Sequence, residues 1–269
     1  MTNATLATPG GTQVVAYPNG LPDSSPSKTG LPRPTATTGT LLEKACAHLI
    51  SVDPKIKPLV EKHHCQIFSA QGLAEEIDPF RSLATGIMAQ QVSGAAAKSI
   101  KKKFIALFTN EDTETARFPT PSQVANTDIP TLRLAGLSQR KAEYIQGLAE
   151  KLATGELNTE MLLKASDEAV MEKLTAVRGL GRWSVEMFSC FALKRTDIFS
   201  TGDLGVQRGM AAYLGKDVTK LKANGGGKWK YMSEKDMLEY SAKFAPYRSL
   251  FMWYMWRAED VDVSAMQNK

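Results

Sequence analysis

Cysteine is scarce in this sequence of 269 residues, which contains only Cys46, Cys65 and Cys190. The three are odd in number and widely spaced, and they form no Cys-x-x-Cys pair, so the pattern indicates no disulfide framework. His63 and His64 precede Cys65, but neighbouring residues point in different directions and no second pair of ligands follows. We therefore expect neither disulfides nor a zinc site.

Long apolar runs are also missing. No segment approaches the roughly 18 consecutive apolar residues of a membrane-spanning helix. The N-terminal region lacks the apolar core of a signal peptide and the Arg-rich amphipathic pattern of a transit peptide. We expect a soluble, intracellular protein that does not insert into a membrane.

Strand-like alternation is nearly absent after Thr40, where apolar residues recur at spacings of three and four. Asp53 with Pro54, and residues 120–123 as a capping box, are typical helix starts. Ser138 opens a segment with Lys141 on its outer face and apolar residues along the other, namely Ala142, Ile145, Leu148, Ala149 and Leu152. An aromatic helix is expected to begin at Ala245 and Pro246. The sequence predicts an all-α protein of about ten helices without a substantial sheet.

The first 38 residues differ from the rest in composition. They contain six of the 13 prolines and are rich in Thr, Ser and Gly. Such a segment buries too little apolar surface to offset its conformational entropy. We expect a disordered tail over residues 1–38, a folded domain over residues 39–262 and a frayed C-terminus over residues 263–269.

The charge is moderately basic, with a net value of +5 and an isoelectric point near 9.0. This is compatible with a polyanionic partner but does not identify one. Residues 215–231 are expected to form a flexible loop rich in lysine, facing either solvent or a phosphate backbone. The loop is not a nucleotide-binding P-loop, because Lys222 stands five residues before Gly227 where that motif requires glycine.

Residues 174–187 are the most informative segment, because two helical stretches flank a turn over residues 177–181. This pattern predicts a helix-hairpin-helix. Gly179 and Gly181 leave backbone N–H groups accessible beside the N-terminus of the following helix, which together can bind a DNA phosphate. The expected contact residues are these two glycines, Arg182 and Ser184. A glycine-rich turn without function remains the alternative from the residues alone.

Asp203 follows this motif and, by residue type alone, is an N-cap for a helix that begins at Leu204. In this context the chain resembles the helix-hairpin-helix DNA glycosylase superfamily, and within it the 3-methyladenine DNA glycosylases of the alkylation-repair type. The resemblance extends over residues 40–262. It includes residues 78–80, 87–93, 118–121, 136–141 and 246–249.

The resemblance implies a two-lobed helical bundle with the DNA and base cleft between its lobes. It implies that Asp203 is the catalytic carboxylate, which stabilises the sugar cation as the N-glycosidic bond breaks. Trp183 and Trp256 match the aromatic residues of the family's pocket for the flipped base, although both could by themselves be core residues. Met187 stands where the bacterial members have a pocket tyrosine, so it is expected to line the same pocket but departs from the family pattern. Gln91 occupies the position of the side chain that fills the gap left by the flipped nucleotide, where the bacterial members have a leucine. From the residues alone it could also be an exposed glutamine at the N-terminus of a helix.

The resemblance also bears on cofactors and on the type of reaction. Family members that cut the strand use a lysine where this chain has Trp183, so a monofunctional enzyme is expected. No cysteine follows Cys190, so the C-terminal iron–sulfur cluster of one branch is not expected. A sodium or potassium ion is implied at the hairpin, held by the backbone carbonyls of Thr175, Val177 and Leu180.

The expected partner is double-stranded DNA with alkylated bases, bound by a monomer located in the nucleus. Two alternatives remain. The first is a DNA-binding module without enzymatic activity, since helix-hairpin-helix units also serve as passive contacts to the DNA backbone. The second is a glycosylase for oxidised or mismatched bases, against which the missing lysine and cysteines argue.

Overall fold

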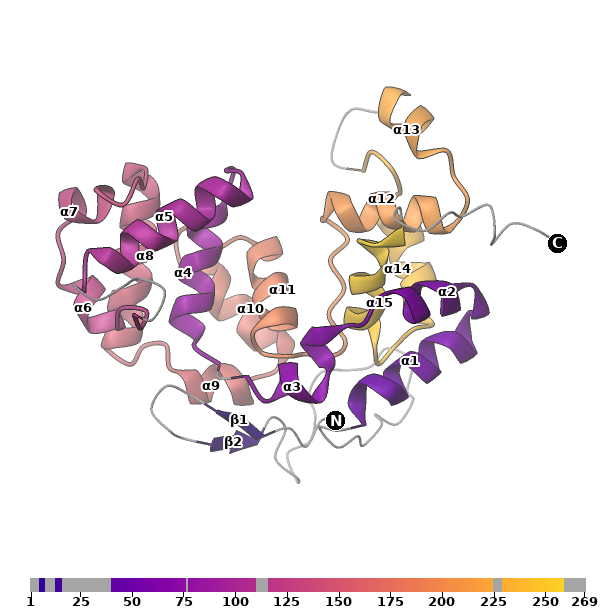
Figure 1. Ribbon diagram of the computed structural model, residues 1–269, viewed down its shortest axis with the longest axis horizontal. Coiled ribbons are helices and arrows are strands. Elements are labelled where there is room, and N and C mark those ends of the chain that lie inside the picture. Colours follow the sequence, from indigo (N-terminus) through magenta and orange to yellow (C-terminus); the bar gives the residue numbers. More distant parts are fainter. Residues whose placement is uncertain are drawn as a thin grey trace. The chain divides into compact units, whose positions relative to one another are not determined.

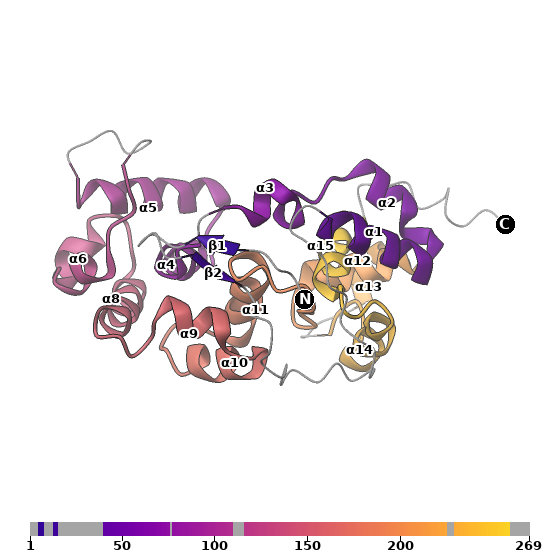
Figure 2. The same ribbon diagram turned by 90° about the horizontal axis from the view of Figure 1, so that it is seen from below.

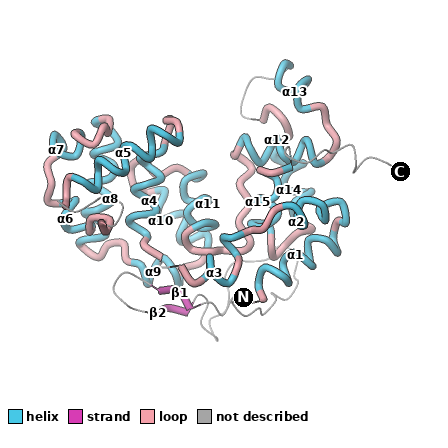
Figure 3. The backbone as a smooth tube through the Cα atoms, viewed as in Figure 1, coloured by secondary structure: helices cyan, strands magenta, loops and turns pink. Residues whose placement is uncertain are grey.

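The computed structural model describes residues 5–7, 13–15, 40–75, 77–109, 116–224 and 229–258. The chain divides into two compact units, each described by itself below. The first unit comprises residues 1–7, 13–75 and 189–269, and the second comprises residues 8–12 and 76–188. Within the described residues both units are dominated by helices (Figure 3). The expected all-α fold is confirmed.

The first unit combines the N-terminal helices with the last part of the chain (Figure 1). Its α-helices are α1 (Leu41–Val52), α2 (Lys57–Lys62), α3 (Ala70–Leu73), α12 (Leu204–Tyr213), α13 (Val218–Asn224), α14 (Glu234–Ala242) and α15 (Arg248–Met255). Two short 3-10 helices are η1 (Pro54–Ile56) and η2 (Gln66–Phe68).

The described residues of the second unit are 77–109 and 116–188. Its helices are α4 (Pro79–Ala89), α5 (Gly94–Ala106), α6 (Pro121–Ala125), α7 (Ile129–Arg133), α8 (Gln139–Ala153), α9 (Thr159–Lys164) and α10 (Asp167–Thr175). Helix α11 (Arg182–Phe191) begins in this unit and ends in the first.

Two strands lie in the segment expected to be a disordered tail. β1 (Thr5–Ala7) pairs antiparallel with β2 (Gln13–Val15), with Leu6 opposite Val14. No strand was expected there, because three residues are too few for alternation to show. The remainder of residues 1–39, and the C-terminal residues 263–269 expected to fray, lie outside the described residues.

The predicted helix starts are confirmed by hydrogen bonds. The Asp53 carboxylate accepts from the Lys55 amide at 3.2 Å, and Thr120 with Gln123 forms a complete capping box. The Ser138 hydroxyl caps α8, whose buried residues are Ala142, Ile145, Leu148 and Ala149. These side chains form the apolar stripe that the spacing predicted.

Helix α15 forms the centre of the first unit. It lies against α1, α12 and α14 (Figures 1 and 2), and its residues from Ser249 to Met255 are all buried. Phe251 stacks on Phe244 with ring centroids 3.9 Å apart. The helix begins at Arg248, slightly later than expected, and its aromatic composition reflects burial on all sides.

Three details of the expected helical pattern were wrong. Fifteen α-helices occur in the described residues, more than expected, because several have only four to six residues and show no periodicity. The segment 215–231 contains α13, which is capped where the Asp217 carboxylate accepts from the Lys220 amide at 3.0 Å. Lys141 does not point into solvent, as described below.

No helix in the described residues is long and apolar enough to cross a membrane.

Asp53 also joins α1 to α14. Its Oδ2 accepts a hydrogen bond from the Tyr240 hydroxyl at 2.7 Å and lies 3.5 Å from the Lys243 ammonium. Burial acts to raise the pKa of Asp53, but the Tyr240 hydroxyl, the Lys55 amide and the Lys243 charge together lower it below its usual value. The ionised carboxylate is therefore the form that stabilises the fold.

We expect Asp53→Asn to lower the free energy of unfolding at pH 7 by about 1.5–3 kcal/mol, the usual contribution of hydrogen bonds to a charged group. Because the folded pKa is lowered, the stabilisation is complete above the unfolded pKa, near 3.9, and is lost as the pH falls through the folded value. Urea unfolding of both proteins from pH 7 to pH 3 measures this. If the difference in unfolding free energy between the two proteins stays constant over this pH range, the proposed role of the charge is contradicted.

Candidate functional site

Asp203 lies at the N-terminus of α12 and accepts two hydrogen bonds through one oxygen. Its Oδ1 accepts from the Val206 amide at 2.8 Å and from the Trp256 indole Nε1 at 3.0 Å. The predicted N-cap is thus confirmed, and the tryptophan adds a second donor that sequence reasoning did not foresee. Together the two donors fix the orientation of the carboxylate.

The segment that leads to Asp203 is attached to the start of α15. The Arg248 guanidinium donates from Nε to Asp197 Oδ1 at 2.7 Å and from Nη2 to Asp197 Oδ2 at 2.9 Å. The buried Ser249 hydroxyl donates to the Arg195 carbonyl at 2.6 Å and accepts from the Ile198 amide at 2.8 Å. A bidentate ion pair of this kind restricts orientation as well as distance. Residues 195–198 are therefore held in one conformation.

Trp256 is supported on a second side by Phe191, the last residue of α11. The two rings stack with centroids 5.6 Å apart and an interplanar angle of 23°. Trp256 is partly exposed, unlike the other tryptophan near the end of α15, Trp253, which is buried. It is therefore an aromatic side chain fixed at the edge of the core, with its indole N–H directed at Asp203. Phe191 was missed because an aromatic residue on an apolar helix gives no separate sequence signal.

Helix α11 carries the other two expected pocket residues, and both belong to the second unit. Trp183 is 49% exposed and Met187 is half-buried. Their spacing of four places them on one helical face. The interpretation of Trp183 as a core residue is wrong, because a core tryptophan would not expose half of its surface.

The hairpin between α10 and α11 has the expected form. Gly179 has φ +92°, and a Cβ added there would lie 2.3 Å from the Tyr144 ring, so only glycine fits. A Cβ on Gly181 would meet nothing within 4 Å, so this residue is accessible rather than sterically required. The Leu180 amide donates to the Val177 carbonyl at 3.1 Å and closes the turn.

The remaining hairpin residues differ in their accessibility. The Arg182 side chain is 76% exposed and donates from Nε to Glu186 Oε1 at 2.8 Å. Ser184 is half-buried in the first turn of α11. The hairpin therefore presents an exposed glycine and an exposed cation at the N-terminus of a helix, which is a suitable arrangement for an anion.

Gln91 lies in the turn between α4 and α5, and its side chain is exposed. The residue has φ +56°, in the left-handed region that residues other than glycine rarely adopt. Its interpretation as a simple N-terminal residue of a helix is wrong, because Ser93 caps α5 by accepting from the Ala96 amide at 3.2 Å. The strained conformation instead presents Gln91 at the tip of the turn.

The Gln91 turn is bonded to its surroundings within the second unit. The Lys141 ammonium donates to the carbonyls of Met88 and Gln90 at 2.8 and 2.7 Å. The Gln90 side-chain amide donates to the Gly179 carbonyl at 2.9 Å. Sequence reasoning missed these bonds because their partners are 51 to 89 residues apart along the chain.

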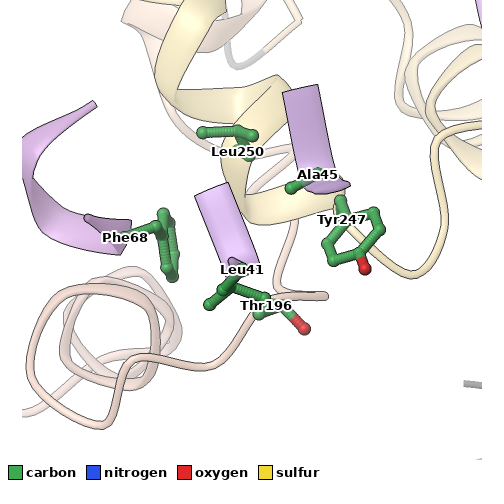
Figure 4. Close-up of a pocket in the computed structure, with 6 residues that line it drawn as sticks. All are labelled: Leu41, Ala45, Phe68, Thr196, Tyr247 and Leu250. Carbon is green, nitrogen blue, oxygen red and sulfur yellow. The ribbon is translucent and has the colours of Figure 1, made fainter. Parts of the chain in front are cut away.

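One apolar pocket lies elsewhere in the first unit (Figure 4). It is lined by Leu41, Ala45, Phe68, Thr196, Tyr247 and Leu250. The pocket has no room for a water molecule and is a packing defect rather than a binding site. Across the residues that the structure describes, no cluster of three or more His, Cys, Asp or Glu side chains is arranged to hold a metal ion.

Residues 84–223 match the family model described as HhH-GPD superfamily base excision DNA repair protein. The match includes Gln91, the hairpin and Asp203.

Two curated relatives are similar over most of their length. A protein of Saccharomyces cerevisiae named DNA-3-methyladenine glycosylase is 33% identical over 245 residues, which cover 82% of this chain and 81% of the relative. DNA-3-methyladenine glycosylase 1 of Schizosaccharomyces pombe is 30% identical over 221 residues, covering 81% of this chain and 88% of the relative.

A solved structure is also similar. The 3-methyladenine DNA glycosylase of Schizosaccharomyces pombe in complex with abasic DNA aligns with a TM-score of 0.64 and 27% identity. The alignment covers 81% of this chain and 97% of that one. The chain therefore belongs to the HhH-GPD superfamily of base excision DNA repair proteins.

Proposed function

We propose that this protein is a DNA-3-methyladenine glycosylase, which flips alkylated purines out of duplex DNA and hydrolyses the N-glycosidic bond to leave an abasic site. The observation that carries the proposal is the pair formed by Asp203 and Trp256, with the carboxylate fixed by two donors beside a supported aromatic ring. The names of the relatives from the two yeasts support the same substrate class. The relative solved with abasic DNA supports DNA as the partner.

The chemistry requires a negative charge near the anomeric carbon. An alkylated purine carries positive charge and leaves readily, so the main demand is to stabilise the sugar as it becomes a cation. Asp203 supplies this charge and can orient or deprotonate the attacking water. Two hydrogen bonds to one carboxylate oxygen hold the group in place, so little reorganisation is needed during the reaction.

The flipped base is expected to bind against aromatic side chains. Trp256 and the half-exposed Trp183 offer electron-rich faces, and stacking of a cationic base on such a face contributes about 0.5–2 kcal/mol. Met187 adds an adaptable apolar surface. Trp183 and Met187 belong to the second unit, and Asp203 and Trp256 belong to the first.

The proposed enzyme is monofunctional. A glycosylase that also cleaves the strand needs an amine in the pocket to form a Schiff base. Trp183, which stands where the lyase members of the family carry that lysine, provides no amine. Hydrolysis assisted by Asp203 is therefore the proposed reaction, and the DNA backbone stays intact.

The proposal includes a sodium or potassium ion at the hairpin. Thr175 is the last residue of α10, where carbonyl groups lack partners within the helix. The carbonyls of Val177 and Leu180 lie in the following turn, and Val177 keeps one lone pair beyond its bond to the Leu180 amide. Neutral backbone carbonyls are suitable ligands for a monovalent ion. The ion would supply a positive charge beside a DNA phosphate.

We further propose that the enzyme acts as a monomer in the nucleus.

The function is tested by chromatography of bases released from methylated duplex DNA. Release of 3-methyladenine, with strand breaks appearing only after alkaline treatment, is the expected result. Binding of the duplex without base release would favour a passive DNA-binding module, and breaks without alkali would contradict the monofunctional mechanism.

A further inference from the structure

The turn between α4 and α5 has a conformation that must be maintained by its surroundings. Gln91 adopts φ +56°, and a residue other than glycine in this region costs of order 1–3 kcal/mol. Such a conformation persists only when neighbouring groups determine it. Ser93 fixes the chain after the turn as the N-cap of α5. A corresponding constraint is needed before the turn.

Lys141 provides that constraint from another helix. Its ammonium donates to the Met88 carbonyl at 2.8 Å and to the Gln90 carbonyl at 2.7 Å. The last carbonyls of α4 have no partners within the helix, and a cation at the C-terminus of a helix is favourable. The two bonded carbonyls also lie immediately before Gln91. Lys141 is thus a C-terminal cap supplied by α8.

The same face of α8 also supports the hairpin. Tyr144 lies three residues after Lys141, and its ring occupies the space where a side chain on Gly179 would be. The Gln90 side-chain amide then joins the turn directly to the Gly179 carbonyl at 2.9 Å. One helical face therefore holds both elements that are expected to contact DNA.

We propose that Lys141 is a positioning residue for the complex in which a nucleotide has been flipped out of the DNA. Lys141 holds Gln91 in the conformation that fills the gap in the DNA, and it keeps the turn at Gln91 aligned with the hairpin. The inference rests on the proposed function, because a gap exists only if a nucleotide is extruded. Lys141 does not contact the reacting atoms. Without its ammonium, the turn can relax to negative φ and Gln91 is no longer presented.

The test uses Lys141→Met, which keeps the length of the side chain and removes the donor. Arg140→Met is the matched control, because Arg140 is the exposed neighbour on α8 and its loss changes the net charge equally. The probe is a duplex with a tetrahydrofuran abasic analogue opposite 2-aminopurine, whose fluorescence rises when a side chain unstacks it. The affinity of each protein for this duplex and for undamaged duplex is measured together with its melting temperature.

For wild type and Arg140→Met we expect the full rise in fluorescence. For Lys141→Met we expect a much smaller rise and about tenfold weaker binding of the abasic duplex, which corresponds to about 1.4 kcal/mol, with unchanged binding of undamaged duplex. Lys141→Arg should recover most of the signal, because a guanidinium can also donate to both carbonyls. If Lys141 had a purely structural role, Lys141→Met would lower the melting temperature but would change the affinities for the two duplexes equally.

Equal signals from wild type and Lys141→Met would overturn the inference, and so would an equal loss in Arg140→Met. If Lys141→Met melts too early to be measured, Gln90→Met removes only the bond to Gly179, and a full signal from that variant would overturn the coupling. Wild-type protein that neither raises the fluorescence nor releases methylated bases would instead contradict the proposed function. The two failures are therefore distinguishable.

Discussion

Asp203→Asn should lower the rate of base release from methylated DNA by about 10²–10³-fold or more, the range found when one preorganised electrostatic group is removed. Asparagine is nearly isosteric with aspartate and is an equally good N-cap, so its side-chain oxygen can still accept from the Val206 amide and the Trp256 indole. The variant therefore removes the charge while retaining the geometry. Single-turnover assays on methylated duplex measure the effect.

The control for this variant is Asp128→Asn. Asp128 caps α7 by accepting from the Thr131 amide at 2.7 Å, so it makes the same local contact as Asp203 on a helix of the second unit. Its replacement should leave base release unchanged. Asp203→Asn should also keep its affinity for abasic duplex, because the carboxylate is not expected to contribute to binding the product. Base release from Asp203→Asn at the wild-type rate would exclude the proposed mechanism.

Gly209→Ala should destabilise the first unit by about 3 kcal/mol or more. A Cβ at Gly209 would lie 1.7 Å from the carbonyl oxygen of Met255, which is backbone and cannot rotate away. Helices α12 and α15 would have to separate. Asp203 is the N-cap of α12 and Trp256 is the C-cap of α15, so the separation would also move this pair apart. Because this contact supports the Asp203 pair, activity should fall together with stability.

The expected decrease in melting temperature is roughly 6–12 °C, since about 1 kcal/mol corresponds to 2–4 °C in a protein of this size. Gly147→Ala is the matched control, because Gly147 lies within α8 and an added Cβ would meet nothing within 4 Å. Alanine should stabilise that helix by roughly 0.5–1 kcal/mol. Thermal unfolding of both variants measures the contrast, and an equal effect at the two positions would refute the close contact as its cause.

The sequence was sufficient for features that depend on local chemistry. The capping box at Thr120, the buried stripe of α8 and the glycine hairpin were predicted because side-chain type and spacing fix them within a few residues. The N-cap role of Asp203 followed from the same reasoning. Its catalytic role did not, because that interpretation came from the resemblance to a family.

Only the tertiary structure decided which distant groups meet. Lys141 was expected on a solvent-facing surface, because an ammonium on an amphipathic helix is usually hydrated, yet it bonds carbonyls that are 51 and 53 residues away. The indole of Trp256 reaches Asp203 across 53 residues, and Phe191 supports it. Periodicity shows which face of a helix is apolar but not which partner lies against it. The contacts that orient Asp203 and Gln91 are therefore properties of the folded chain.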